Sequence, residues 1–302
     1  MKAIDLFAGA GGFSTGATMA GCNVVWAANH WPEAVQVHTN NHPGTIHLCQ
    51  DLHQADWTQV PAHDLLLASP ACQGHSRARG KERPHHDAQR ATAWAVVSAA
   101  EYHRPQAVVV ENVPEFTRWA LFPAWCEAMR ALGYTMAPHL TDAADHGVPQ
   151  HRRRVFIVGT RSRAKIELQL PRRAHVPAAR FVDFNAGRWA QVDRPGRSPA
   201  TLARVHAGRL QHGGRFLTAF YGNERGGRSL LRPVGAITTR DRWAIVDGDR
   251  MRMLTVEECR HAMGFPTTYQ LPARAKDAMH MLGNAVCPPV ARDVINALRA
   301  AA

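Results

Sequence analysis

A cysteine and a glutamate each follow an apolar run and are suited to covalent chemistry. Cys72 lies in Ser69-Pro-Ala-Cys-Gln73, shortly after Leu65-Leu-Leu67, and Glu111 directly follows residues 107–110. If both runs are parallel strands, both side chains lie at the same edge of a sheet. A thiol nucleophile beside a carboxylic acid suits covalent catalysis with acid assistance. Positive charge lowers a thiol pKa, and the candidates that supply it are Arg77, Arg79, Arg152 and Arg154.

A glycine-rich turn forms a second candidate site. The stretch Asp5-Leu-Phe-Ala-Gly-Ala-Gly-Gly-Phe13 joins an expected strand to an expected helix, where doubly wound folds bind a nucleotide-like cofactor. It lacks the Gly-x-Gly-x-x-Gly spacing of a pyrophosphate loop, which favours a nucleoside ligand without a diphosphate. His30 and Trp31 follow the second strand, and Asp51 is placed to accept from an adenine amino group. A plain turn and a helix-capping Asp are the structural alternatives.

These residues need a sheet that brings strand ends together, and the sequence predicts one. Short apolar runs alternate with amphipathic segments, which is typical of an α/β fold with a mostly parallel sheet. The expected strands are 3–7, 24–28, 64–68, 107–110 and 154–158, and the expected helices are 13–20, 32–40, 88–101 and 123–132. After about residue 165, Gly, Pro and Arg become frequent, which predicts a smaller irregular domain with strands at 235–238 and 243–246. A helix over 290–302 follows Pro288-Pro289.

The sequence resembles the DNA (cytosine-5)-methyltransferases of bacteria and their phages. The elements that carry the resemblance occur in the family's order and span almost the whole chain. They are Asp5-Leu-Phe-Ala-Gly-Ala-Gly-Gly-Phe13, Ser69-Pro-Ala-Cys-Gln73, Glu111-Asn-Val-Pro114, Gln150-His-Arg-Arg-Arg154, Arg252-Met-Leu-Thr255 with Gly264-Phe-Pro266, and Gly283-Asn-Ala-Val286.

The resemblance implies a mechanism in which Cys72 adds to C6 of a cytosine that has left the duplex. Carbon C5 then attacks the methyl group of S-adenosylmethionine, and loss of the C5 proton and the thiol completes the reaction. Glu111 would contact N3 and the amino group, while Arg152 and Arg154 would hold the base and the active-site loop. Phe7 would stack on adenine. The other implied cofactor contacts are Gly9, Gly11, Gly12, His30, Trp31, Asp51, Pro70 and Asn284.

Two positions depart from the family pattern. The second strand usually ends in an acidic residue that binds the ribose hydroxyls, and here His30 stands beside Asn29. Two prolines often precede the family's cysteine, whereas Ala71 separates Pro70 from Cys72 here. The first departure puts the ribose contact in doubt, and Trp31 still fits a stacking role.

The resemblance also implies the domain organisation: a Rossmann-like, S-adenosylmethionine-dependent methyltransferase sheet with a second, smaller target-recognition domain. The catalytic and cofactor-binding domain would cover residues 1–165, and the target-recognition domain residues 166–275. Residues 276–302 would return to the catalytic domain.

The net charge of +12 is concentrated in one part of the chain. Residues 172–252 hold sixteen Arg, no Lys and six Asp or Glu, a net charge of +10. Arginine forms forked contacts to phosphate and guanine, so this segment predicts double-stranded DNA as the partner. A solvated basic face is the alternative. The expected DNA contacts are Arg225, Arg228, Arg240 and Arg242, with Arg77 and Arg79 in the catalytic loop.

Composition sets further limits. There is no apolar run long enough for a membrane span, and the chain starts directly with a strand pattern, so we expect neither a membrane anchor nor a signal peptide. Six cysteines without a Cys-x-x-Cys pair predict reduced thiols in the cytoplasm. The best histidine cluster, His42 and His47 with Cys49, lacks a zinc spacing, so we expect surface or loop histidines and no metal. We expect a monomer.

Three rival functions stay open at this point. The first is RNA cytosine-5 methylation on the same scaffold, although the Cys-Phe-Thr element of relatives that act on transfer RNA is absent. The second is a catalytically silent DNA-binding regulator, against which an intact Cys72 and Glu111 argue. The third is transfer of a group other than methyl from a modified cofactor.

Overall fold

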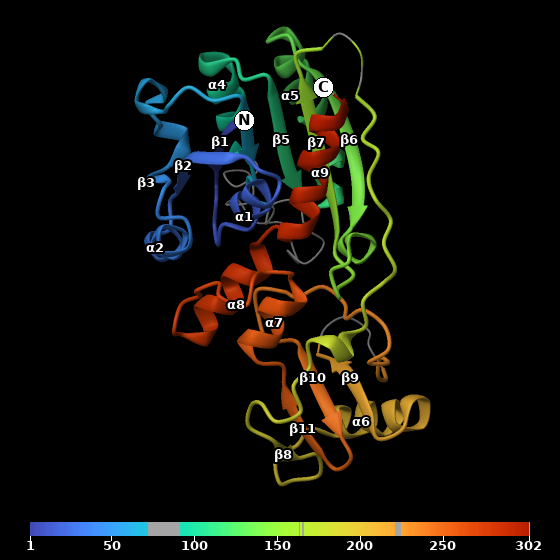
Figure 1. Cartoon of the computed structure of the whole chain (residues 1–302). Helices are drawn as coiled ribbons and strands as arrows, with labels where there is room; N and C mark the ends of the chain where they lie inside the picture. Colours follow the sequence, from blue (N-terminus) through green and yellow to red (C-terminus); the bar gives the residue numbers. More distant parts are fainter. Residues whose placement is uncertain (72–90, 163, 165, 221–224, 302) are drawn as a thin grey trace. The chain divides into compact units, whose positions relative to one another are not determined.

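The computed structural model describes residues 1–71, 91–162, 164, 166–220 and 225–301, which form two compact units (Figure 1). Unit 1 comprises Met1–Asp142, Arg153–Arg172 and Ala285–Ala302. Unit 2 comprises Ala143–Arg152 and Arg173–Asn284. The residues of unit 2 differ from the expected range of 166–275, because residues 143–152 and 276–284 pack with unit 2 and residues 166–172 pack with unit 1. The assignment of catalytic and recognition roles to the two units stays a prediction.

Unit 1 contains a mixed seven-stranded sheet in the order β3-β2-β1-β4-β5-β7-β6. Strand β7 is antiparallel to both of its neighbours, and the other paired strands are parallel. The strands are β1 (Lys2–Leu6), β2 (Asn23–Asn29), β3 (Ile46–Cys49), β4 (Leu65–Ala68), β5 (Ala107–Asn112), β6 (Thr135–Asp142) and β7 (Arg153–Thr160). Continuous apolar runs such as Leu65–Ala68, buried on both faces, are typical of such central strands.

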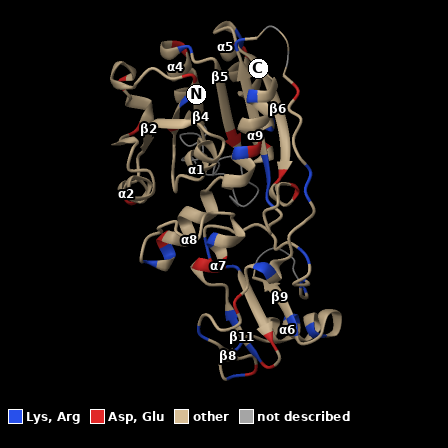
Figure 2. Ribbon diagram, viewed as in Figure 1, with Lys and Arg blue, Asp and Glu red and all other residues tan. Residues whose placement is uncertain are grey.

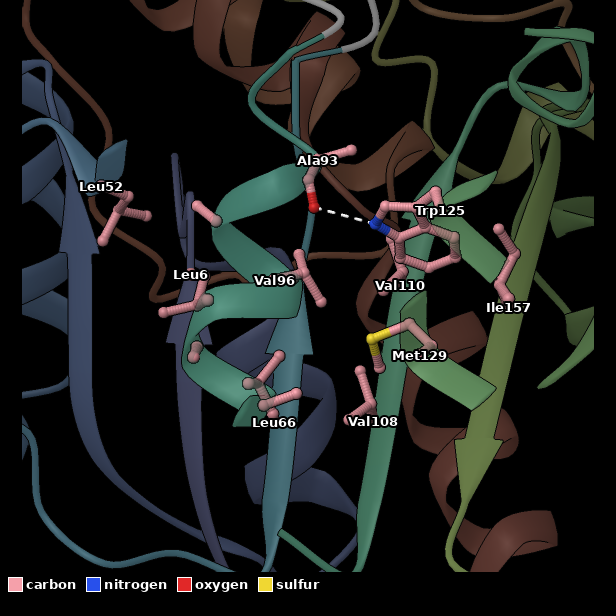
Figure 3. Packing of buried hydrophobic residues seen from close by; sticks show 14 of the residues in the cluster. Leu6, Leu52, Leu66, Ala93, Val96, Val108, Val110, Trp125, Met129 and Ile157 are labelled. Carbon is pink, nitrogen blue, oxygen red and sulfur yellow. Dashed lines mark hydrogen bonds between the residues drawn. The ribbon is translucent and has the colours of Figure 1, made fainter. Parts of the chain in front are cut away.

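Helices cover both faces of this sheet. They are α1 (Gly12–Met19), α2 (Pro32–Asn41), α4 (Trp94–His103), α5 (Phe122–Ala131) and α9 (Pro288–Ala301). Figure 3 shows Val96 of α4 and Trp125 of α5 over strand residues such as Val108. The buried indole nitrogen of Trp125 donates to the Ala93 carbonyl at 2.9 Å, so this bulky side chain leaves no buried donor unpaired (Figure 3).

On the other face, α1 packs closely against α9. A β-carbon at Gly16 would lie 2.5 Å from Cβ of Ala291 and 2.6 Å from the Pro288 carbonyl oxygen, so only glycine fits without movement. The rings of Phe13 and Phe156 meet edge to face at 5.9 Å. The last helix of the chain therefore fixes the helix that follows the glycine-rich turn.

Unit 2 contains a smaller antiparallel sheet in the order β8-β11-β10-β9. Its elements are β8 (Ala190–Gln191), α6 (Pro199–His212), β9 (Arg215–Ala219), β10 (Trp243–Asp247), β11 (Arg250–Met253), α7 (Val256–Ala262) and α8 (Ala275–Asn284). Phe216, Val246 and Met251 form its small core with Val205 of α6. Buried Arg252 pairs with Glu258, whose carboxylate also accepts from Thr255 N–H as part of a capping box.

The α/β prediction is confirmed, and the second part of the chain corrects two expectations. Residues 235–238 form no strand, and only an isolated bridge joins Val234 to Gln150. Residues 199–212 form helix α6, although we expected irregular structure there. Ser198 caps this helix and Pro199 is its first residue, a start signal that marks it in the sequence.

Charge and hydropathy are distributed as the sequence predicts. Figure 2 shows basic residues on α6, β9 and β11 of unit 2. Among the described helices, none has the length and apolar character needed to cross a bilayer. The cysteines at 22, 49, 126, 259 and 287 are free, in agreement with reduced thiols.

Candidate active site and cofactor turn

The glycine-rich turn has a strained backbone. Phe7 has a φ of 61°, a left-handed conformation that is uncommon for a bulky residue, and Gly9 and Gly11 follow with φ values of 54° and 76°. The turn is closed by a hydrogen bond from Gly11 N–H to the Ala8 carbonyl at 2.8 Å. Such strain persists only where the surrounding structure imposes it, and it clusters at binding sites. Gly12 then begins α1.

This turn lies at the point where the strand order reverses direction. Strand β1 pairs with β2 on one side and with β4 on the other. In doubly wound folds, the connections that leave the strand ends at such a reversal run to opposite sides of the sheet, and ligands bind in the crevice between them. Ser69, which follows β4, donates its N–H to the Leu6 carbonyl at 3.1 Å. The start of the loop that carries Cys72 is therefore fixed to the end of β1, beside Phe7.

The same loop is also tied to the end of β5. The side-chain amide of Asn112 donates to the Pro70 carbonyl at 3.1 Å, and Ala71 N–H donates to Thr92 Oγ1 at 3.1 Å. Asn112 directly follows Glu111, so Pro70 is anchored beside the strand end that carries the predicted acid. Cys72 lies outside the described residues, as do Arg77 and Arg79. The sequence analysis missed Asn112, although it is part of the quoted Glu111-Asn-Val-Pro114 stretch.

Glu111 and Arg154 form an ion pair. Arg154 Nε lies 3.0 Å from Glu111 Oε1, and the two side chains are 18% and 7% exposed. Pairing of β5 with antiparallel β7 produces this contact, because Glu111 lies opposite Phe156. The guanidinium orients a carboxylate that has little access to water and stabilises its charge.

Arg152 makes a different set of contacts. It is buried in unit 2 and donates to the backbone carbonyls of Ile237 at 3.0 Å and Gly283 at 2.8 Å. Nearby, Gln150 accepts from Ile237 N–H at 2.7 Å and donates to the Ala262 carbonyl at 3.0 Å. These bonds join three segments of unit 2 that are distant in sequence, so Arg152 has a structural role there whatever its role in catalysis.

The expected ribose and adenine residues lie after β2 and β3. Exposed His30 follows β2, and Trp31 N–H donates to the Asn29 side chain at 3.0 Å just before α2. Exposed Asp51 caps a 3-10 turn over Leu52–Gln54 by accepting from His53 N–H. Asp51 therefore caps this turn, which was the structural alternative for it. Its side chain is exposed, and a carboxylate has a second oxygen that can still accept from a ligand.

Asn284 ends helix α8 in unit 2, where its side-chain nitrogen lies 3.4 Å from His280 Nε2. The residue before it has no space for a side chain, since a β-carbon at Gly283 would lie 2.2 Å from Thr239 N. The side chain of Asn284 is exposed and available for a contact.

The predicted DNA-contacting arginines divide into two pairs. Arg225 and Arg240 are exposed. Arg228 places its guanidinium 5.3 Å from the ring centre of Trp243, and Arg242 donates to the Phe220 carbonyl at 3.1 Å. The latter pair therefore also contributes to the folding of unit 2.

The histidine expectation needs correction. His38 is buried on α2, and its ring lies 4.5 Å from that of His42 and 4.9 Å from that of His47. These are not isolated surface or loop side chains. Within the part of the chain that the structure describes, no group of side chains has the arrangement of a metal site.

Comparisons with known proteins agree with this geometry. The sequence model of the family described as C-5 cytosine-specific DNA methylase matches residues 1–193 and 221–300. The type II methyltransferase M.NlaX of Neisseria lactamica is 26% identical over 99% of this chain and 96% of the relative. M.HgiDI of Herpetosiphon aurantiacus is 29% identical over 95% and 90%.

Solved structures show the same fold. A putative DNA modification methyltransferase encoded within an E. coli prophage superposes with a TM-score of 0.74 at 17% identity, covering 100% of this chain and 99% of that one. Spodoptera frugiperda DNMT2 gives 0.69 at 16% identity, covering 99% of both chains. The strained glycine turn at the strand-order reversal and the Glu111–Arg154 pair thus lie on a methyltransferase fold, and the chain belongs to the C-5 cytosine-specific DNA methylases.

Proposed function

We propose that this DNA cytosine-5 methyltransferase acts on double-stranded DNA through a covalent bond between Cys72 and a cytosine extruded from the helix. The Glu111–Arg154 pair supports this most directly. Its carboxyl group is shielded from water, and Glu111 directly precedes Asn112, which binds the carbonyl of Pro70 two residues before Cys72 in the sequence. Arg154 orients the carboxyl so that Glu111 can contact N3 and the amino group of the base.

Methyl transfer would proceed through a covalent bond between Cys72 and the base. The Cys72 thiolate would form a bond to C6 of the ring, and the electron pair of the C5–C6 double bond becomes available at C5. C5 would then bond to the methyl carbon as the bond from that carbon to the cofactor sulfur breaks, with its electron pair staying on the sulfur. A base removes the C5 proton, the double bond re-forms and the thiolate leaves. Glu111 would stabilise the charge that develops on the ring when the thiolate adds.

The fold and the family are those of S-adenosylmethionine-dependent methyltransferases, and the turn residues fit that cofactor. Bound S-adenosylmethionine would supply an electrophilic methyl group on a sulfonium. Gly9, Gly11 and Gly12 allow close approach without a pyrophosphate loop, and Phe7 offers a ring for stacking. His30, Trp31, Asp51, Pro70 and Asn284 are the remaining proposed contacts. Exposed Arg225 and Arg240 are the first candidates for contact with DNA, followed by Arg228 and Arg242. Monomeric action in the cytoplasm stays a prediction.

A methylation assay tests this proposal. Purified protein, S-adenosylmethionine and duplex DNA should give 5-methylcytosine at one sequence motif, located by bisulfite sequencing. Cys72→Ala should lose at least about 10³-fold in rate and still bind DNA. Duplexes with 5-fluorocytosine at the target should trap a covalent adduct, because fluorine cannot leave as a proton does.

Three results would overturn it. They are substantial activity of Cys72→Ala, methylation of transfer RNA in preference to duplex DNA, or a mass for the modified base that differs from that of a methyl adduct.

A further inference from the structure

Three histidines lie against the helix that follows the cofactor turn. His38 of α2 is 1% exposed, and it contacts His42 of the same helix and His47 of β3. Burial, followed by the neighbouring imidazoles, holds the pKa of His38 well below its usual 6.5. Burial lowers the pKa of His42 to about 4. Both rings are therefore neutral near pH 7, and a neutral ring has one donor and one acceptor nitrogen.

Hydrogen bonds link these histidines to the cofactor turn. Ser14 Oγ donates to Asp5 Oδ2 at 2.7 Å and lies 2.9 Å from His38 Nε2. The other ring nitrogen of His38, Nδ1, lies 2.7 Å from His47 Nε2. A continuous chain of hydrogen bonds therefore runs from His47 through His38 and Ser14 to Asp5.

At one end of this chain of hydrogen bonds, Asp5 and Ser14 lie on either side of the cofactor turn in the sequence. Asp5 precedes Phe7 on β1, and Ser14 is the third residue of α1, whose N-terminal cap is Gly11. The same carboxylate oxygen of Asp5 also accepts from Ser14 N–H at 3.1 Å. Asp5 and Ser14 therefore hold the beginning and the end of the turn together, and His38 fixes the Ser14 hydroxyl from behind.

A small hollow brings the same imidazoles to the turn. Its lining includes Gly9, Asn29, Val35, His38 and His47. Gly9 has a φ of 54°, and Asn29 ends the strand that leads to the expected ribose residue. The histidine chain therefore borders the same hollow as the strained segment, in addition to its link through Ser14.

We propose that His38 is a positioning residue for cofactor binding, holding the Phe7–Gly11 turn in its binding conformation through Ser14 and Asp5. The inference rests on the proposed function, because the ligand of the turn is the nucleoside cofactor. A left-handed Phe7 is costly, and its surroundings must impose it. A turn that is already in place does not have to be ordered when the ligand binds.

The chain also makes cofactor affinity depend on pH. The titratable groups that face His38 are Asp5 from β1, His42 from α2 and His47 from β3, and the hydroxyls of Ser14 and Thr15 face this cluster from α1. A protonated His38 has two donors and no acceptor. Because burial holds the pKa of His38 well below 6.5, this protonation, and with it the expected loss of cofactor affinity, comes only at pH values well below 6.5.

Binding of S-adenosylhomocysteine to the full-length protein, measured by calorimetry, tests the proposal. His38→Leu removes both bonds and should raise Kd about tenfold, roughly what two net hydrogen bonds contribute. The value of kcat at saturating S-adenosylmethionine should change less than about threefold. His38→Gln can still donate to Ser14 and should recover most of the affinity. The control is His63→Leu, which removes a buried histidine that contacts His103 instead of the turn.

The outcomes separate the two proposals. Failure of the wild type to bind S-adenosylhomocysteine contradicts the proposed cofactor site. A folded His38→Leu with wild-type Kd and an unchanged pH profile contradicts the positioning role. If His38→Leu does not fold, two substitutions of half-buried His47 test the proposal instead. His47→Gln keeps a polar partner for His38, so affinity should persist, whereas His47→Leu should weaken binding. Equal Kd values for these two variants would also overturn the inference.

Discussion

Among the side chains that the structure describes, Glu111 is the one on which the proposed chemistry depends most. Glu111→Gln keeps its size and one acceptor but removes the acidic proton that the carboxyl group would supply to N3 as the thiolate adds. We expect the methylation rate to fall by about 10²- to 10⁴-fold, the usual contribution of a positioned acid or base. Cofactor Kd should stay within about twofold, as calorimetry with S-adenosylhomocysteine can verify. Glu127→Gln, a change at an exposed ion pair on α5, is the control. A rate within tenfold of wild type would exclude the assigned role.

Single residues differ in how far the sequence could predict them. Glu111 and Arg154 were each expected near the site, because Glu111 follows one apolar strand and Arg154 begins another, and the structure shows that they form an ion pair. The contacts of Arg152 were not predictable in this way. Its partners are carbonyl groups 85 and 131 residues further along the chain, and backbone acceptors leave no residue-type signal. The link from His38 to Ser14 crosses two helices and was missed for a similar reason.

At the scale of elements, the contact of α1 with α9 couples the C-terminal helix to the cofactor turn. Gly16→Ala gains up to about 1 kcal/mol in helix propensity. Overpacking against Ala291 and Pro288 costs about 1–3 kcal/mol, because the clashing atoms belong to another helix and its backbone. We expect net destabilisation, measured as a lower urea midpoint.

Gly44→Ala is the matched control in the same unit, since a β-carbon there meets nothing within 4 Å. Its free energy of unfolding should change by less than about 0.5 kcal/mol. Equal midpoints for the two variants would mean that α1 and α9 can separate at little cost.

Elements with a strong local signal were predicted well, and those that depend on distant partners were not. Strands β1, β2, β4 and β5 are near-continuous apolar runs, and the sequence identified all four. Strand β3 (Ile46–Cys49) is largely exposed and β6 (Thr135–Asp142) contains Pro138, so neither has a clear apolar pattern. Residues 235–238 have strand-like composition, yet Gln150 and Arg152 take up backbone groups of Ile237, leaving it outside the sheet.

Across the whole molecule, the two units differ in their charged and titratable side chains. The arginine excess lies mostly in unit 2, where part of it is internally engaged. Arg215 and Arg250 both pair with Asp247, and Arg252 pairs with Glu258. The histidines with a lowered pKa all lie in unit 1: His38, His42, His47, His63 and His103. Salt should therefore act mainly on DNA contact through unit 2, and acid mainly on the stability of unit 1.

The sign of this acid effect follows from proton linkage. Burial lowers the folded-state pKa of these five imidazoles below 6.5, so the unfolded chain binds more protons there and stability falls as the pH drops through 6.5. Asp5 acts in the opposite sense, because burial raises its pKa from 3.8 to about 7 and the folded chain takes up that proton first. The effect of the five histidines on stability outweighs that of Asp5. Counting only His42 and His63, whose pKa is lowered to about 4, against Asp5, stability should fall by on the order of 1 kcal/mol between pH 6.5 and 5.

This window lies above the ordinary pKa of carboxyl groups, so it reports the histidines together with the opposing titration of Asp5. Amide hydrogen exchange should report the loss in β1, β4 and β5 of unit 1, with β9 and β10 of unit 2 much less affected. A double variant, His63→Gln with His103→Gln, removes two of the five groups at a distance from the cofactor turn and should make the pH dependence shallower. A stability that is constant or rises from pH 6.5 to 5 would show that these imidazoles accept protons in the folded protein, so that neither ring of the His63–His103 pair is held neutral by burial.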